Sequence, residues 1–328
     1  MQQRLVKAPK KWLLAALKVA VSVVLLALLA RSTDLGAIAD TLGRLPIAAM
    51  VLACALLVAQ TLVLGLRWWL VMRAIRAPIG YAKLVPLIFT GIFFNQVLPT
   101  SFGGDAVRMW QAHRAGVRPE AAVGGVLLER ISGVLGLVIL SALGVWYMGS
   151  QIDNQALRLG LLAMLPLGFL GALVLASLDR IPDRWRRLRL LDDLARLAKD
   201  ARCVLFAPGT ALPLLLLSIL SHALAAAAVY VFASSLHLGL SVWDCLALFP
   251  PVILVTLIPI SFAGWGLREG AMVALFAFAG VNADTALALS LAFGVALLAA
   301  SLPGYACWLA WRGPPMLESV PRPSPDSR

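Results

Sequence analysis

Long apolar runs, separated by short basic segments or by segments rich in glycine and proline, dominate the pattern of this sequence. Crossing about 30 Å of hydrocarbon takes roughly 20 apolar residues in a helix. Six runs are long enough, and they lie near residues 12–30, 47–70, 121–147, 157–178, 211–235 and 285–311. The pattern therefore predicts an all-α polytopic membrane protein with about six full spans.

Two further apolar stretches are too short or too interrupted to be simple spans. Residues 84–98 end at Pro99 in a glycine-rich turn, and residues 245–258 contain Pro250 and Pro251 before a similar turn. Broken helices are tolerated at membrane depth only where protein or a polar cavity surrounds them. We expect each stretch to be a re-entrant half-helix that forms a hairpin with the helix after it.

The two broken stretches belong to an internal repeat. The sequence LPTSFGGDAVR at residues 98–108 recurs as IPISFAGWGLR at residues 258–268. Each copy follows two spans and precedes another, which divides the chain into halves at 12–147 and 157–311. Three crossings per half is an odd number, so we predict an inverted second half. Inverted repeats with broken helices near the midplane are a transporter architecture.

Composition and charge agree with a membrane protein. Hydrophobic residues make up 61% of the chain and charged residues 13%, against about 25% charged in soluble domains, which excludes a water-soluble enzyme. The net charge of +12 does not indicate a nucleic-acid partner, because 22 of the 28 Lys and Arg residues lie between apolar runs or at the termini, in the stretches 1–11, 67–83, 108–118, 179–210 and 312–328. The positive-inside rule then predicts a multi-pass protein of the bacterial cytoplasmic membrane, with both termini in the cytoplasm.

Three segments lie outside the predicted spans. Residues 1–11 are a basic cytoplasmic amino terminus. Residues 179–210 carry apolar positions at helical spacing among arginines, which predicts an amphipathic linker on the cytoplasmic leaflet. A simple connection and a regulatory role both remain open for it. Residues 312–328 contain five prolines and no apolar core, so we expect a disordered tail.

The turn of each hairpin carries residues suited to an anion. Arg108 lies about one turn into a helix whose first N–H groups and dipole favour negative charge, and its planar fork can bind a phosphate through two hydrogen bonds. Arg268 repeats this position. The candidate substrate-binding residues of the two copies are Asn95, Pro99, Ser101, Gly103, Gly104, Asp105, Arg108, Pro259, Ser261, Gly264, Gly266, Arg268 and Glu269. The alternative is that Pro and Gly only break and pack the hairpins while each Arg extends to the interface.

Glu129 and Arg130 complete the candidate set, because they lie inside an otherwise apolar predicted span. Charges at membrane depth are costly and mark either a functional site or an ion pair. Pairs of Glu129 with Arg108 and of Arg130 with Asp105 would brace the first hairpin. Substrate contact and bracing both remain open for these two residues.

The sequence carries no signature of a cofactor or a metal, and we expect neither. The three histidines lie far apart and have no Cys, Asp or Glu partner at ligand spacing, which disfavours zinc. No P-loop, GxSxG or HExxH pattern is present. The apolar run at 121–147 contains four glycines that are expected to allow close helix packing and not nucleotide binding: Gly124, Gly125, Gly133 and Gly136.

The motifs together resemble the lysylphosphatidylglycerol synthase transmembrane-region family, whose members are also described as flippase-like. The resemblance rests on NQVLP at 95–99, GGD at 103–105 with Arg108, the pair Glu129-Arg130, and the stretch 259–269, and it covers about residues 12–311. It implies a lipid flippase-like integral membrane domain. The full synthase carries a soluble aminoacyl-transfer domain after this region, and because the present sequence stops at Arg328 we do not expect lipid aminoacylation.

Three functions are consistent with these observations. The first is a transporter, not an enzyme, that moves an anionic phospholipid or a polyprenyl-phosphate-linked headgroup between leaflets, with membrane lipids as its partners. The second is a membrane glycosyl- or headgroup-transferase that uses a lipid phosphate, although the acidic pair that such chemistry usually needs is found only at Asp192-Asp193. The third is an accessory subunit of a lipid-modifying enzyme. A homo-oligomer is also possible.

Overall fold

The computed structural model describes residues 8–77, 79–98, 102–149, 155–178, 189–258 and 260–311, which contain helices and no strands. In chain order the helices are α1 (Ala8–Ser32), α2 (Leu35–Gly43), α3 (Ile47–Ala74), α4 (Tyr81–Val97), α5 (Gly103–Arg114), α6 (Pro119–Tyr147), α7 (Gln155–Ser177), α8 (Arg189–Leu205), α9 (Pro208–Ser235), α10 (Val242–Thr256), α11 (Leu267–Phe276) and α12 (Ala283–Ala310), with a short 3₁₀ helix at Ala277–Ala279. The predicted all-α class is confirmed. The predicted tail at 312–328 lies outside the described residues.

Four helices are long and apolar enough to cross a membrane: α3, α6, α9 and α12. Each has 28 or 29 residues, which makes about 42 Å of helix. Helices α1 and α2 are bent by 95° at their junction and together make a fifth candidate. The described residues thus contain four spans, or five with the bent pair, instead of the six predicted. The chain is a multi-pass membrane protein.

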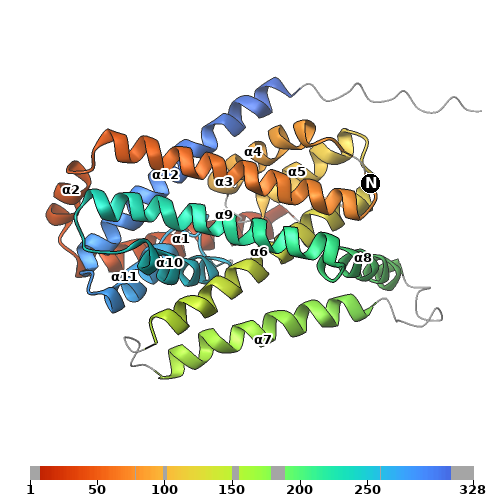
Figure 1. The fold of residues 1–328 in the computed structure, drawn as a ribbon. Coiled ribbons are helices and arrows are strands. Elements are labelled where there is room, and N and C mark those ends of the chain that lie inside the picture. Colours follow the sequence, from red (N-terminus) through yellow and green to blue (C-terminus); the bar gives the residue numbers. More distant parts are fainter. Residues whose placement is uncertain are drawn as a thin grey trace, which may run out of the picture.

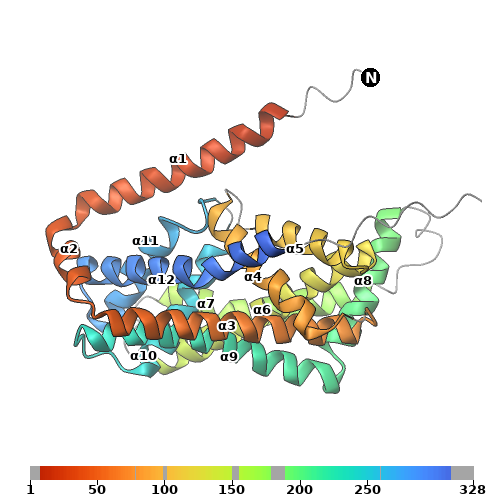
Figure 2. The ribbon, with the colours of Figure 1, turned by 90° about the horizontal axis from the view of Figure 1, so that it is seen from above.

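The long helices form a bundle with distinct ends (Figures 1 and 2). Helices α3 and α9 run side by side, and α12 packs against both. Helix α8 lies at one end of the bundle, whereas α2, α10 and α11 lie at the other. The short pair α4 and α5 lies toward the α8 end, so the two helix pairs that contain the repeated motif occupy opposite ends.

Two large buried apolar cores and one small cluster around Ile38 hold the bundle together. One joins α9, α10, α11 and α12 through large side chains such as Phe232, Phe249 and Phe276. The other joins α3, α4 and α6 and includes Trp68 and Ile88. The outer faces of these helices remain apolar, as a lipid environment requires.

Three of the four glycines expected to pack helices do so on α6. A Cβ at Gly125 would collide with Met72 Sδ, one at Gly133 with the guanidinium of Arg67, and one at Gly136 with Ser218. Gly124 differs, because its nearest neighbour would be Leu197 Cδ1 at 3.7 Å, an ordinary contact.

Both predicted broken stretches form a helix, a turn and a second helix. Helix α4 contains Pro86 and ends where Leu98 becomes extended, and α5 begins five residues later. Helix α10 contains Pro250 and Pro251, both buried. A proline inside a helix removes one backbone hydrogen bond and kinks or breaks the helix. Here α4 still continues to Val97 and α10 to Thr256.

Helix α8 confirms the helical part of the predicted linker. Its buried face carries Ala195, Ala198, Ala201 and Val204. This face packs on α6, α7 and α9, and the Arg202 guanidinium donates to the Ala176 carbonyl oxygen at 3.0 Å. The apolar side of α8 is therefore covered by the protein's own helices and not by the leaflet alone. The start of the linker, residues 179–188, lies outside the described residues.

Candidate functional site

A cluster of charged side chains is buried where α3, α5 and α6 meet. This charge cluster consists of Arg67, Asp105, Arg108, Glu129 and Arg130. The first four are at most 4% exposed, whereas the Arg130 side chain is 37% exposed. Charges at membrane depth persist when they are paired and hydrogen-bonded, and every member of the cluster is paired.

Glu129 connects two arginines from different helices. Its Oε1 accepts hydrogen bonds from Arg67, with the Arg67 Nε at 3.0 Å and the Arg67 Nη2 closer still. Its Oε2 accepts from Arg108 Nη2 at 2.7 Å. One carboxylate therefore joins α3, α5 and α6.

Asp105 also accepts hydrogen bonds from two arginines of the charge cluster. Its Oδ1 accepts from Arg108 Nε at 3.1 Å, one turn along the same helix. Arg130 binds it in the bidentate geometry, with Nε 3.0 Å from Oδ2 and Nη2 3.0 Å from Oδ1. The predicted pairs Glu129–Arg108 and Arg130–Asp105 are both confirmed.

The sequence reasoning missed Arg67, which it placed in a basic cytoplasmic stretch. The structure buries Arg67 inside α3, where its Nη1 also donates to Ser218 Oγ at 3.4 Å. On the same face of α9, His222 Nε2 lies 3.0 Å from the Gly133 carbonyl oxygen and donates to it. The available signal was a single charge inside the apolar run LVLGLRWWLVM, which calls for a buried partner.

The first hairpin turn places Gly104 against α4. The Gly104 N–H donates to Asn95 Oδ1 at 2.8 Å, and a Cβ there would collide with the Gly91 carbonyl oxygen. Gly103 and Gly104 both lie in the first turn of α5 without a positive φ, and at Gly104 the glycine permits the close approach to α4. Pro99 and Ser101 lie outside the described residues.

The second copy holds its arginine in a separate buried cluster. Arg268 Nη2 lies 2.6 Å from Glu269 Oε1, and Arg268 Nε lies 3.2 Å from Ser290 Oγ on α12. The guanidinium also stacks over the Trp265 ring at 4.8 Å. Glu269 therefore holds Arg268.

The glycines before α11 adopt positive φ angles, unlike Gly103 and Gly104 at the start of α5. Gly264 and Gly266 have φ of 83° and 85°, and Ala263 has φ of 47°. The Gly266 N–H donates to Glu269 Oε2 at 2.5 Å. Ser261 is buried, and its Oγ has no partner among the described residues. Pro259 lies outside the described residues.

The starts of α5 and α11 are thus occupied by the protein's own groups. Asn95 and Asp105 lie at the start of α5, and Glu269 lies at the start of α11. These groups take the positions at which an anion was expected to bind. If these hairpin residues bind a substrate, their hydrogen bonds and ion pairs with one another must first break.

The charge cluster borders a small cavity and carries unbalanced charge. The cavity has a volume of about 30 Å³ and is lined by Asn95, Asp105, Arg108 and Arg130 with apolar neighbours, which is room for water and not for a lipid headgroup. Three arginines face two carboxylates, and the buried Arg108 Nη1 has no hydrogen-bond partner within the described chain. Across the same residues, no group of three His, Cys, Asp or Glu side chains could hold a metal ion.

The fold and the charge cluster define a multi-pass all-α membrane protein with ion pairs buried between a broken-helix pair and its long helices. The family model for the lysylphosphatidylglycerol synthase TM region matches residues 15–304, so the chain belongs to that family. The match includes both arginine clusters. No curated protein matches the sequence. Family membership indicates a membrane protein of lipid metabolism or lipid transport.

Proposed function

We propose that this protein is a transporter that moves an anionic phospholipid or a lipid-phosphate-linked headgroup between the leaflets of the cell membrane. The observation that carries the proposal is the excess positive charge of the charge cluster, together with the unpartnered Nη1 of Arg108. A buried guanidinium with an unused donor is costly. A phosphate oxygen would satisfy that donor and neutralise the charge.

The ion pairs suggest how access to the site is controlled. Because the cavity beside Arg108 is as small as about 30 Å³, a headgroup can enter only if α4 and α5 move relative to α6. Such a movement exchanges the contacts of Arg108 with Asp105 and Glu129 for contacts with phosphate. Arg108 would keep charge-assisted hydrogen bonds in both arrangements, which limits the free-energy difference between them.

The architecture that we propose for transport has six crossings: α1, α3, α6, α7, α9 and α12. Residues 12–147 and 157–311 would then be inverted halves, each contributing one re-entrant helix pair. The position of the two pairs at opposite ends of the bundle supports this proposal, because each leaflet would then have one arginine-bearing hairpin. Both termini would lie in the cytoplasm, as the distribution of basic residues favours.

We propose a transporter and not a transferase because the buried carboxylates are already engaged. Asp105 and Glu129 each accept hydrogen bonds from two arginines. A carboxylate held in this way has few lone pairs left to bind a metal or to remove a proton.

The experiment that tests this function uses the purified full chain in liposomes. Loss of fluorescent lipid to a membrane-impermeant quencher would be followed for phosphatidylglycerol, phosphatidylethanolamine and a polyprenyl phosphate. We expect faster movement of an anionic lipid, and we expect Arg108→Ala and Arg268→Ala each to slow it. Arg44→Ala is the matched control, because Arg44 is exposed in the connection after α2. Wild-type rates in both cluster variants would refute the proposed site, and immobility of every lipid tested would refute transport of these classes.

A further inference from the structure

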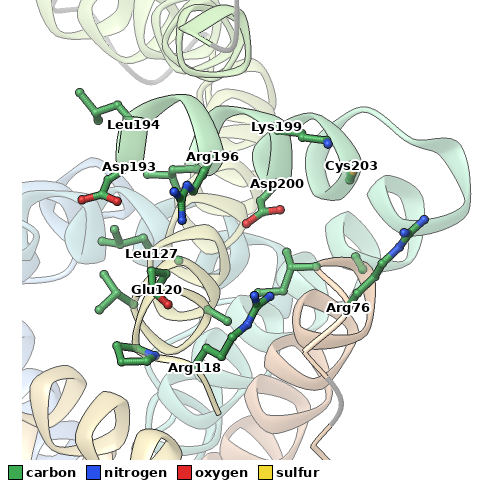
Figure 3. A pocket seen from close by; sticks show the side chains of 17 residues that line it. Arg76, Arg118, Glu120, Leu127, Asp193, Leu194, Arg196, Lys199, Asp200 and Cys203 are labelled. Atoms are coloured by element: carbon green, nitrogen blue, oxygen red, sulfur yellow. The ribbon is translucent and has the colours of Figure 1, made fainter. Parts of the chain in front are cut away.

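A second, larger cavity lies at the end of the bundle where α3 ends, α6 begins and α8 crosses (Figure 3). Its volume is about 720 Å³, within the usual range of ligand sites. Its walls come from three different helices and from the residues that connect them, and neither arginine cluster contributes to it. Its chemistry is therefore independent of the site described above.

The charged residues that line this cavity carry more positive than negative charge. The four basic residues are Arg76, Arg118, Arg196 and Lys199, and the three acidic residues are Glu120, Asp193 and Asp200. Arg196 and Asp200 extend from α8 toward the start of α6, and Arg118 extends toward them from the opposite wall (Figure 3). Burial raises the pKa of Asp200, whereas the nearby Lys199 and Arg118 lower it.

The same walls also carry apolar residues, some of which are exposed on the outer surface of the bundle. Val123 and Leu127 on α6 are 44% and 40% exposed. Leu194 and Leu197 on α8 line the facing wall. Since α6 is long and apolar enough to span the membrane, Val123 and Leu127 would face acyl chains there. A ligand that contacts both the charged and the apolar residues must itself have a charged part and an apolar part.

We propose that this cavity binds the phosphate headgroup of an anionic phospholipid from the adjacent leaflet, with its acyl chains along Val123 and Leu127. The basic residues bind the phosphate, and the α8 wall separates the headgroup from bulk water. This site does not require lipid movement, and it stands whether or not the protein is a transporter.

Cys203 provides a reporter, because it lines the cavity and is exposed. Replacing Cys54, Cys245 and Cys307 leaves it as the single thiol, which is then labelled with bimane. The labelled full chain is placed in nanodiscs of phosphatidylcholine. The quencher is a nitroxide near the start of one acyl chain. Quenching of the bimane fluorescence is compared between phosphatidylglycerol and phosphatidylcholine that carry this same nitroxide.

We expect nitroxide-labelled phosphatidylglycerol to reach half-maximal quenching at a mole fraction about fivefold lower than labelled phosphatidylcholine. This ratio is the gain in affinity that one basic residue near the membrane surface gives to an anionic lipid. Arg118→Glu combined with Lys199→Glu should abolish this preference. Arg44→Glu, at the opposite end of α3, should keep it. Both cavity residues are exposed, so size-exclusion profiles should match the parent protein.

Three results would overturn the proposal. Equal quenching by the two lipids would show that the headgroup is not recognised. A preference that persists in the double variant would show that the cavity is not responsible. A change in bimane emission on adding inorganic phosphate alone, in discs of phosphatidylcholine, would assign the cavity to a soluble phosphate compound and not to a lipid. Because binding is read at equilibrium, none of these results depends on transport.

Discussion

Arg67 and Glu129, 62 positions apart in the chain, form an ion pair that ties α3 to α6 inside the bundle. Their side chains are 4% and 1% exposed. The pair fits because α6 carries a glycine one turn further on: a Cβ at Gly133 would lie 2.9 Å from Arg67 Nη2 and 3.2 Å from its Cζ. Since Glu129 also holds Arg108, its charge determines how three helices meet.

Removal of the Glu129 charge should therefore destabilise the protein strongly. Glu129→Gln leaves Arg67 and Arg108 buried with no carboxylate in common, and breaking a buried pair costs about 3–5 kcal/mol. The free energy of unfolding would be measured in detergent by titration with SDS, followed by circular dichroism. Glu120→Gln is the control, because Glu120 is exposed in the first turn of the same helix. Equal unfolding free energies for the two variants would contradict the structural role of Glu129.

The contact between α4 and α5 should depend on the absence of a side chain at Gly104. Gly104→Ala places a Cβ against the Gly91 carbonyl oxygen, and overpacking of this kind costs about 1–3 kcal/mol. Gly270→Ala is the matched control, since a Cβ at Gly270 on α11 meets nothing within 4 Å. We expect Gly270→Ala to be neutral or to stabilise by about 0.5–1 kcal/mol. The same SDS titration measures both, and an unchanged midpoint for Gly104→Ala would contradict the close contact.

The sequence predicted the parts of the fold that depend on local pattern and on the cost of charge in lipid. Glu129–Arg108 and Arg130–Asp105 were predictable because charges inside an apolar run need partners, and the first copy of the repeat carries both an arginine and an aspartate. Arg67 was missed because a basic residue beside Trp68 and Trp69 also fits a helix end at the interface.

Other features depend on contacts that no local pattern reveals. The predicted span at 12–30 lies within α1, but α2 and the 95° bend between the two helices were not predicted. Asp34 caps α2 by accepting from the Gly36 N–H at 2.8 Å, and this capping residue was a usable signal. By contrast, the docking of α1 through the Phe262 N–H and Ser22 Oγ, 2.7 Å apart, joins residues 240 positions apart and could be found only from the structure.

Guanidinium geometry, and not charge alone, should determine the transport rate. Arg108 uses Nε for Asp105 and Nη2 for Glu129, and a lysine ammonium cannot reproduce this planar arrangement. In the proposed transport state this fork binds the lipid phosphate, and losing one charge-assisted hydrogen bond of about 1.5–3 kcal/mol to that phosphate predicts a rate roughly 10- to 100-fold lower for Arg108→Lys. The liposome assay measures this rate, with exposed Arg31→Lys as the control. A rate within a factor of two of the wild type would show that only the charge at position 108 matters.

Acidic pH should stabilise the α8 end of the bundle through Asp200. Burial is the largest influence on this carboxyl and raises its pKa above the ordinary value of 3.8, against the opposing effect of Lys199 and Arg118. The folded protein then binds this proton more tightly than the unfolded chain does, so its contribution to stability is greatest below pH 3.8 and falls as the pH rises toward the folded pKa. Asp200→Asn should remove this fall and raise the unfolding temperature at pH 7.

The measurement is the unfolding temperature in detergent between acidic and neutral pH. Asp193→Asn is the matched control, because Asp193 is exposed on the same helix and lines the same cavity. We expect the Asp200→Asn curve to converge with the wild-type curve at the acidic end and to lie above it at neutral pH, whereas Asp193→Asn should follow the wild type throughout. Curves for Asp200→Asn and wild type that run parallel at every pH would show that burial of this carboxyl has no effect on its proton affinity.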